Sequence, residues 1–307
     1  MKNIICNLSP FNNSEDMSTW EYVIKKLLAF VVLYCFAAVL GEGIIIGMLC
    51  GMGYDPLHGI MPTGVIGELL PYYGFIVFLL VTVIYCKFIE KRGMKSMGFS
   101  SKIADFFVGA LLAVVLIVVI IGLSCVFDSM VFNGFSEKGN NVHLVRWLLA
   151  FVIQGVAEEV MCRGFLLQAL LKKTSMSMAI IISSTAFAFP HFFTLFESEL
   201  LYAIIGVVNL YLISIIFSLL VILRSNIWIA FGLHSIWNFV LYGIMGLSVS
   251  GSESKSEGLI QFCVKDANIL NGAEYGMEAS IIATLILALV VFGLAKIYKD
   301  RMGKNGI

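Results

Sequence analysis

The chain has 307 residues, of which 60% are hydrophobic and 13% charged, and its mean hydropathy is +0.96. Soluble domains carry about a quarter charged residues, so this composition excludes a soluble enzyme with a solvated surface. The 20 Lys and Arg residues balance 20 Asp and Glu residues, which leaves no basic surface for binding and predicts no nucleic-acid partner. The composition is typical of a polytopic helical membrane protein, whose surroundings are the lipid bilayer.

The first 22 residues are polar and acidic and lack the pattern of a cleaved signal peptide. We expect residues 1–22 to form a cytoplasmic tail and residues 23–303 to form a single membrane-embedded helical domain. Eight apolar stretches follow the tail, each near or above the roughly 18–20 residues that cross a bilayer core. None alternates with period two, as the strands of a membrane barrel do. We therefore predict an all-α bundle of about eight transmembrane helices, near 27–50, 65–88, 104–127, 144–171, 177–195, 201–223, 227–247 and 279–298.

The Lys and Arg residues are distributed unevenly between the two ends of these predicted spans. If both termini are cytoplasmic, 15 of the 20 basic residues lie on the cytoplasmic side and 4 lie on the opposite side. The positive-inside rule favours this orientation. We expect a multi-pass protein of the cell membrane with both termini in the cytoplasm.

The fourth predicted span carries Glu158, Glu159 and Arg163 in its middle. Ionisable groups at this depth are costly, so each is a candidate functional residue. Glu159 and Arg163 are four residues apart and share one helical face, while Glu158 points one position further round. We expect Arg163 to hold one carboxylate and leave the other available. A purely structural ion-pair cluster is the alternative, but two carboxylates with one cation leave a surplus negative charge.

Two further spans carry polar side chains at a similar depth. His191 follows Pro190, which should kink the fifth span, and His234 and Asn238 share one face of the seventh. At about 1.5 Å per helical residue, Glu158, His191 and Asn238 lie roughly 21 Å, and His234 roughly 15 Å, from the cytoplasmic ends of their spans. These groups can therefore converge on one cavity. A carboxylate with a His can deprotonate water, and a His with an Asn can stabilise an oxyanion, although each could singly be a helix–helix hydrogen bond.

The motifs Glu158-Glu159-x-x-x-Arg163, Phe187-x-x-x-His191 and His234-x-x-x-Asn238 resemble the three signature motifs of one family of intramembrane proteases. This family, called CPBP, contains the CAAX prenyl endopeptidases and the bacteriocin-processing or Abi proteins. The resemblance runs from about residue 145 to 245. The stretches KRGMKSMGF and GAEYGMEAS also look like connectors of this family. The resemblance implies an eight-helix membrane core, with the catalytic part at about residues 144–247.

The resemblance also implies an activity and assigns roles within it. The family cleaves peptide bonds near the membrane, so the expected substrate is a membrane-associated or lipidated peptide or protein that enters from the membrane or the cytoplasmic side. By resemblance, Glu158 and His191 would activate the attacking water. His234 and Asn238 would stabilise the oxyanion.

Glu159 and Arg163 would support these residues as structural partners. Members of the family have been described both as metalloproteases and as glutamate-dependent proteases without a metal ion, and the sequence leaves both open. No cofactor is required by the motifs; if a divalent metal ion such as zinc is bound, Glu158, His191 and His234 are its expected ligands. The H-E-x-x-H spacing of helical zinc sites is missing from the sequence.

Two other functions are compatible with the same residues. The chain could be a non-catalytic scaffold or bacteriocin-immunity protein that keeps the fold for binding. It could also be a proton-coupled transporter that uses Glu158 and Glu159 as proton carriers. The two halves of the sequence show no matched broken helices, which argues against the transporter.

Overall fold

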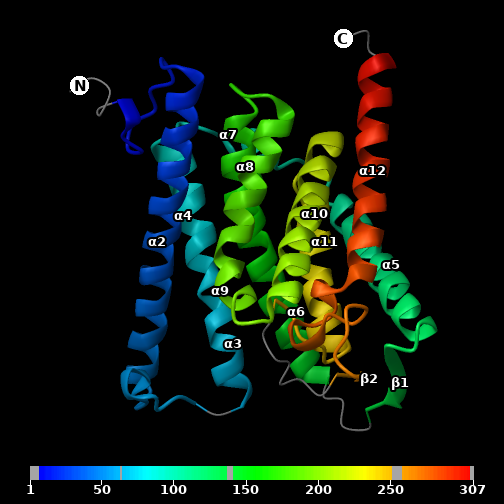
Figure 1. The fold of residues 1–307 in the computed structure, drawn as a ribbon. Helices are drawn as coiled ribbons and strands as arrows, with labels where there is room; N and C mark the ends of the chain where they lie inside the picture. Colours follow the sequence, from blue (N-terminus) through cyan, green and yellow to red (C-terminus); the bar gives the residue numbers. More distant parts are fainter. Residues whose placement is uncertain (1–6, 63, 137–140, 251–257, 305–307) are drawn as a thin grey trace.

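The computed structural model describes residues 7–62, 64–136, 141–250 and 258–304, and these residues form a bundle of helices with a small sheet at one end (Figure 1). The α-helices are α2 (Thr19–Gly51), α3 (Val65–Tyr73), α4 (Phe75–Phe88), α5 (Asp105–Val126), α6 (Asn141–Glu159), α7 (Gln168–Leu170), α8 (Met176–Ala188), α9 (Phe192–Leu195), α10 (Leu200–Arg224), α11 (Trp228–Asn238) and α12 (Ile281–Lys304). Short 3₁₀ turns span Pro56–His58, Met94–Met97, Phe189–His191, Ala273–Tyr275 and Met277–Ala279. The all-α prediction is confirmed.

Six helical segments in the described part of the chain are long and apolar enough to cross a membrane. They are Thr19–Gly51, Leu69–Phe88, Asp105–Val126, Met176–Leu195, Leu200–Arg224 and Ile281–Gly303. The fourth and seventh predicted spans are helical as well but do not meet this criterion. The fourth contains buried charges, and the seventh is the shorter apolar helix Trp228–Ile244. These two less regular spans carry five of the six polar residues singled out in the sequence.

Helix α2 begins inside the range assigned to the N-terminal tail. Ser18 caps it, because its side chain accepts a hydrogen bond from the Glu21 amide and its own amide donates to the Glu21 carboxylate. Residues before the cap contact the bundle: Lys25 Nζ donates to Asn12 Oδ1 at 2.6 Å and to the carbonyl of Ser14 at 2.7 Å. The described part of the tail is therefore packed against the helices.

A two-stranded antiparallel sheet, absent from the sequence prediction, joins β1 (Met130–Phe135) to β2 (Ile260–Val264). A register shift lies between Phe132 and Gly134, where Gly134 has a φ of +105°. Figure 1 shows the sheet at the end of the bundle opposite to the two chain termini. Both termini lie at one end, as an even number of spans requires. Which end faces the cytoplasm remains a prediction from the Lys and Arg distribution.

Helix α11 crosses α5 at a distance that only glycine permits. A Cβ atom on Gly232 would lie 1.8 Å from the Phe106 carbonyl oxygen, and one on Gly109 would lie 2.0 Å from the Ile229 carbonyl oxygen. Small residues of this kind let helix backbones approach closely in membrane proteins. The crossing fixes the position of α11, the helix that carries His234.

Gly232→Ala should destabilise the protein by about 1–3 kcal/mol, because the added methyl group overpacks the α5–α11 crossing. The measurement is the thermal unfolding midpoint of the detergent-purified protein, followed by circular dichroism. Gly122→Ala is the matched control, since no heavy atom lies within 4 Å of a Cβ built on this glycine of α5. An equal midpoint for the two variants would contradict the role of the close crossing.

Candidate active site

The two helices that carry the first and third motifs both widen into a π-helix, the first within its motif and the second directly after its motif. Helix α6 continues as the π-helix Val160–Leu167, and α11 continues as the π-helix Phe239–Ile244. π-turns are rare in proteins as a whole but occur often at functional sites. Their wider turn changes the direction of the side chains and disturbs the regular hydrogen bonding.

Arg92 satisfies carbonyl groups of the first π-helix. Its guanidinium donates to the carbonyl of Gly164 at 3.1 Å and to that of Phe165 at 3.3 Å. The same guanidinium forms an ion pair of 3.0 Å with Glu90, and both side chains are almost fully buried. Arg92 belongs to the KRGMKSMGF connector, so this connector supports the π-helix that follows Glu158 and Glu159 in the chain.

Arg163 is completely buried and makes both polar and aromatic contacts. It forms an ion pair of 2.8 Å with Glu159 and donates to the carbonyl and hydroxyl oxygens of Ser214 at 3.1 and 2.5 Å. Its guanidinium lies over the rings of Phe187 and Phe217, 4.6 and 5.0 Å from their centroids. The pairing of Arg163 with one carboxylate, expected from the i, i+4 spacing, is present, and Glu159 is the carboxylate that it holds.

His234 lies between the two glutamates. Its Nδ1 is 3.0 Å from Glu159 Oε1, and since a carboxylate only accepts, this contact places a proton on Nδ1. Its Nε2 is 3.8 Å from Glu158 Oε2. The other oxygen of Glu158 accepts a hydrogen bond of 3.1 Å from Gln154. Glu159 therefore orients the imidazole so that its second nitrogen faces Glu158.

His191 lies where the fifth predicted span is interrupted. The 3₁₀ turn Phe189–His191 separates α8 from α9, as the sequence predicts from Pro190. His191 Nδ1 donates to the Phe187 carbonyl at 3.1 Å, which leaves Nε2 as the proton-accepting nitrogen of the neutral ring. The Phe187 ring also contacts the imidazole, with centroids 5.2 Å apart. The broken helix thus fixes both the position and the tautomer of His191.

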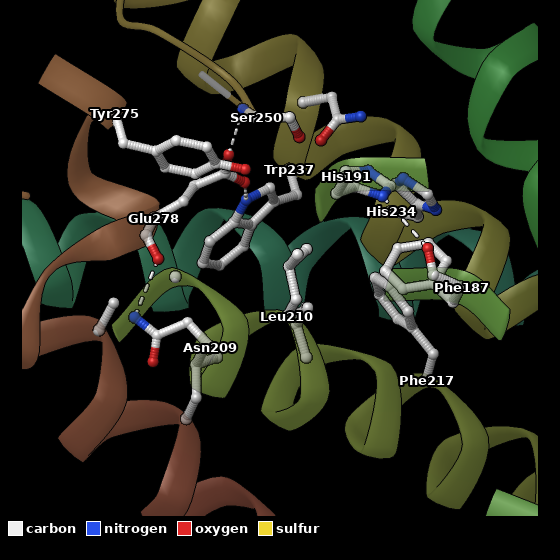
Figure 2. Close-up of a pocket in the computed structure, with 15 residues that line it drawn as sticks. Phe187, His191, Asn209, Leu210, Phe217, His234, Trp237, Ser250, Tyr275 and Glu278 are labelled. Atoms are coloured by element: carbon white, nitrogen blue, oxygen red, sulfur yellow. Dashed lines mark hydrogen bonds between the residues drawn. The ribbon is translucent and has the colours of Figure 1, made fainter. Parts of the chain in front are cut away.

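Two adjoining cavities bring the candidate residues together. Glu158 and His191 line a cavity of about 210 Å³, and His191, His234 and Asn238 line a second cavity of about 40 Å³. Phe187, His191 and Ser250 belong to both. The Phe187 ring contacts both imidazoles, with its centroid 5.2 Å from that of His191 and 5.7 Å from that of His234 (Figure 2). The four polar residues thus come from three separate segments of the chain and meet around His191.

The sequence reading did not assign a role to several residues that shape this site. Ser214 and Phe217 of α10 hold Arg163, and Phe217 also stacks on the His234 ring with centroids 5.1 Å apart. A serine inside an apolar span is a signal that could have indicated Ser214. Nothing in the local pattern distinguishes Phe217 from the other aromatic residues of the bundle.

The donor set does not fit a metal ion. Among the residues described by the structure, no three His, Cys, Asp or Glu side chains are grouped so that they could hold one. Of the expected ligands, Glu158 lines one cavity, His234 lines the other and His191 lines both, whereas a structural or catalytic zinc ion needs three or four donors around one point.

Residues 140–240 match the family model of Rce1-like type II CAAX prenyl endopeptidases. This segment is similar to that family. It contains all three motifs and covers about a third of the chain. No curated protein matched the chain. The Rce1-like segment, together with six apolar helices in the described residues, supports a multi-pass membrane peptidase with an intramembrane CAAX-protease activity in general.

Proposed function

We propose that the chain is an intramembrane endopeptidase that hydrolyses peptide bonds of membrane-associated or lipidated substrates with water activated by Glu158. The observation that carries the proposal is the cavity shared by Glu158 and His191, two groups from different helices that meet among apolar spans. A carboxylate and a neutral imidazole that face one water-accessible space are two proton acceptors suited to activating water for hydrolysis.

In the first step, Glu158 takes a proton from a cavity water while His191 orients that water through Nε2. The resulting hydroxide attacks the substrate carbonyl carbon and forms a tetrahedral intermediate. When the C–N bond breaks, the proton on Glu158 passes to the leaving amine. General acid–base catalysis of this kind contributes about 10²- to 10⁴-fold to the rate.

His234 and Asn238 would stabilise the negative charge that develops on the carbonyl oxygen. Glu159 holds the proton on Nδ1 of His234, and its carboxylate 3.0 Å away favours an imidazolium with a second proton on Nε2, which can donate to the oxyanion. Asn238 lines the same cavity and supplies an amide donor. Donors fixed in a site of low dielectric are worth more than donors in water, because they need no reorganisation.

A third cavity provides a route for an apolar substrate. It has a volume of about 570 Å³, is formed by α2, α3, α4 and the loop after α2, and shares Phe75 and Phe78 with the cavity of Glu158. Glu42 is the one charged group in its otherwise apolar lining. Its size and lining suit a lipidated or apolar peptide segment that enters sideways from the bilayer.

The test uses purified protein in lipid nanodiscs and a quenched peptide library that includes lipidated members. Wild type should cleave a subset of the library, and cleavage should persist with 1,10-phenanthroline, because the described residues contain no three-ligand group. His191→Gln should lower the cleavage rate about 10²-fold. His58→Gln is the matched control, since this exposed histidine lies in the loop after α2.

Each arm can contradict the proposal. Cleavage by His191→Gln at the wild-type rate would remove this histidine from the chemistry, and loss of cleavage with the chelator would show that a metal ion is needed. Wild type that cleaves no peptide in any lipid composition would favour the non-catalytic scaffold or immunity protein.

A further inference from the structure

Gln154 lies one helical turn before Glu158 on α6 and belongs to none of the three motifs. Its side-chain Nε2 donates a hydrogen bond of 3.1 Å to Glu158 Oε1, and both residues line the cavity of about 210 Å³ that His191 also lines. Because a carboxylate only accepts hydrogen bonds, the amino end of the Gln154 amide is the end that faces Glu158. Gln154 therefore contacts the proposed base directly.

The two neighbouring glutamates are held to different degrees. Glu159 is fully buried, forms an ion pair of 2.8 Å with Arg163 and lies 3.0 Å from His234 Nδ1. Glu158 pairs with no Lys or Arg among the described residues, and its contact with His234 Nε2 is 3.8 Å long, beyond the range of a hydrogen bond. In the part of the chain that the structure describes, the Gln154 amide is thus the one hydrogen-bond donor to the Glu158 carboxylate.

The fold gains little from an amide at position 154. The Gln154 Oε1 atom is buried and has no hydrogen-bond partner among the described residues. A buried acceptor without a partner is unfavourable, whereas an apolar side chain of the same length would place no such atom there. The Glu158 side chain is 18% exposed, so water in the cavity can replace the hydrogen bond if the amide is removed. The physical effect that remains for the amide is the orientation of Glu158.

We infer that Gln154 is a positioning residue that holds the Glu158 carboxylate in the rotamer from which it takes a proton from the cavity water. With Oε1 bound to Gln154, Oε2 is left to accept that proton. A base fixed in its reactive position needs no rearrangement before the proton moves, whereas an unrestrained glutamate spends much of its time in other rotamers. The inference rests on the proposed function, because it concerns the step in which Glu158 activates water.

Gln154→Met removes the amide and keeps an unbranched side chain of the same length. Its kcat should fall about 10- to 10²-fold and its KM should change by about twofold or less, because the variant misplaces the base and leaves substrate binding intact. The thermal unfolding midpoint should be unchanged or higher, since the unpaired oxygen is removed with the amide. Gln154→Leu, with a different shape, should behave in the same way.

Gln168→Leu is the matched control for both variants. Gln168 of α7 follows on the same helical segment, is half-buried and lies outside the three cavities described above. Its replacement should leave kcat at the wild-type value. A folded Gln154→Met protein with the same kcat as this control would overturn the inference.

A double-mutant cycle separates positioning from packing. Glu158→Asp shortens the carboxylate side chain by one methylene group and should move it out of reach of the Gln154 amide. If Gln154 acts through this hydrogen bond, Gln154→Met should lower kcat by about twofold or less in the Glu158→Asp background. An equal loss of kcat in both backgrounds, or a lower unfolding midpoint for Gln154→Met, would show a structural role and overturn the inference.

Crystal structures of wild type and Gln154→Met, grown from a lipid mesophase, test the positioning without turnover. Glu158 should occupy one rotamer in wild type and more than one in the variant. If this difference is found but wild type cleaves no peptide, the proposed function is overturned and the positioning of Glu158 by Gln154 stands. The same single rotamer of Glu158 in both proteins would overturn the inference.

Discussion

Glu158→Gln should lower kcat for peptide cleavage by about 10²- to 10⁴-fold while the protein remains folded. The amide has the same shape as the carboxylate but cannot accept the proton of the attacking water. The Glu158 side chain lines the cavity and is 18% exposed, so the loss of its charge should disturb the packing little. The measurement is the steady-state rate on the best library peptide, with the thermal unfolding midpoint as the check on folding.

Glu197→Gln provides the matched control for this variant. Glu197 is an exposed acid between α9 and α10, so its replacement should leave both the rate and the unfolding midpoint unchanged. Glu158→Asp keeps the carboxylate but withdraws it from the cavity, and its activity should lie between those of wild type and Glu158→Gln. A folded Glu158→Gln protein with the wild-type rate would remove Glu158 from the chemistry.

Arg163→Met should destabilise the protein by about 3–5 kcal/mol, the largest effect on stability that we expect. Arg163 and Glu159 are both fully buried, so removal of the guanidinium leaves the Glu159 carboxylate with no cation at membrane depth. The variant also loses the hydrogen bonds to Ser214. Unfolding in mixed micelles, followed by circular dichroism, measures the change. Arg301→Met, at an exposed position of α12, should have no comparable effect.

The double variant Glu159→Gln/Arg163→Met separates charge from packing. If the uncompensated carboxylate is the main cause of destabilisation, neutralising it should restore much of the lost stability, because a buried ion pair replaced as a unit costs far less than one broken in half. A double variant no more stable than Arg163→Met would contradict this explanation.

The sequence predicted those features of the fold and site that depend on local pattern. The apolar spans follow from composition, the contact between Glu159 and Arg163 follows from their i, i+4 spacing, and the break at His191 follows from Pro190. The contact between His234 and Glu159 could not be predicted in the same way. It joins residues far apart in the chain, and no periodicity tells which face of one helix meets which face of another.

The irregular elements were missed for a similar reason. The pairing of β1 with β2 joins short segments on either side of residues 140–240, and a two-stranded ribbon is too small to leave a strong pattern. The π-helix after Glu159 is accompanied by hydrogen bonds from Arg92 to the carbonyls of Gly164 and Phe165, which are tertiary contacts. The KRGMKSMGF connector resembles a family feature, but only the structure shows what Arg92 contacts.

The most direct test of Glu158-dependent hydrolysis is mass spectrometry of the fragments produced in H₂¹⁸O by wild type and by folded Glu158→Gln. We predict that wild type gives two fragments from each cleaved peptide, with one ¹⁸O atom in the new carboxyl group, and that Glu158→Gln gives no labelled fragment above background. Labelled fragments formed equally by both proteins would contradict the account.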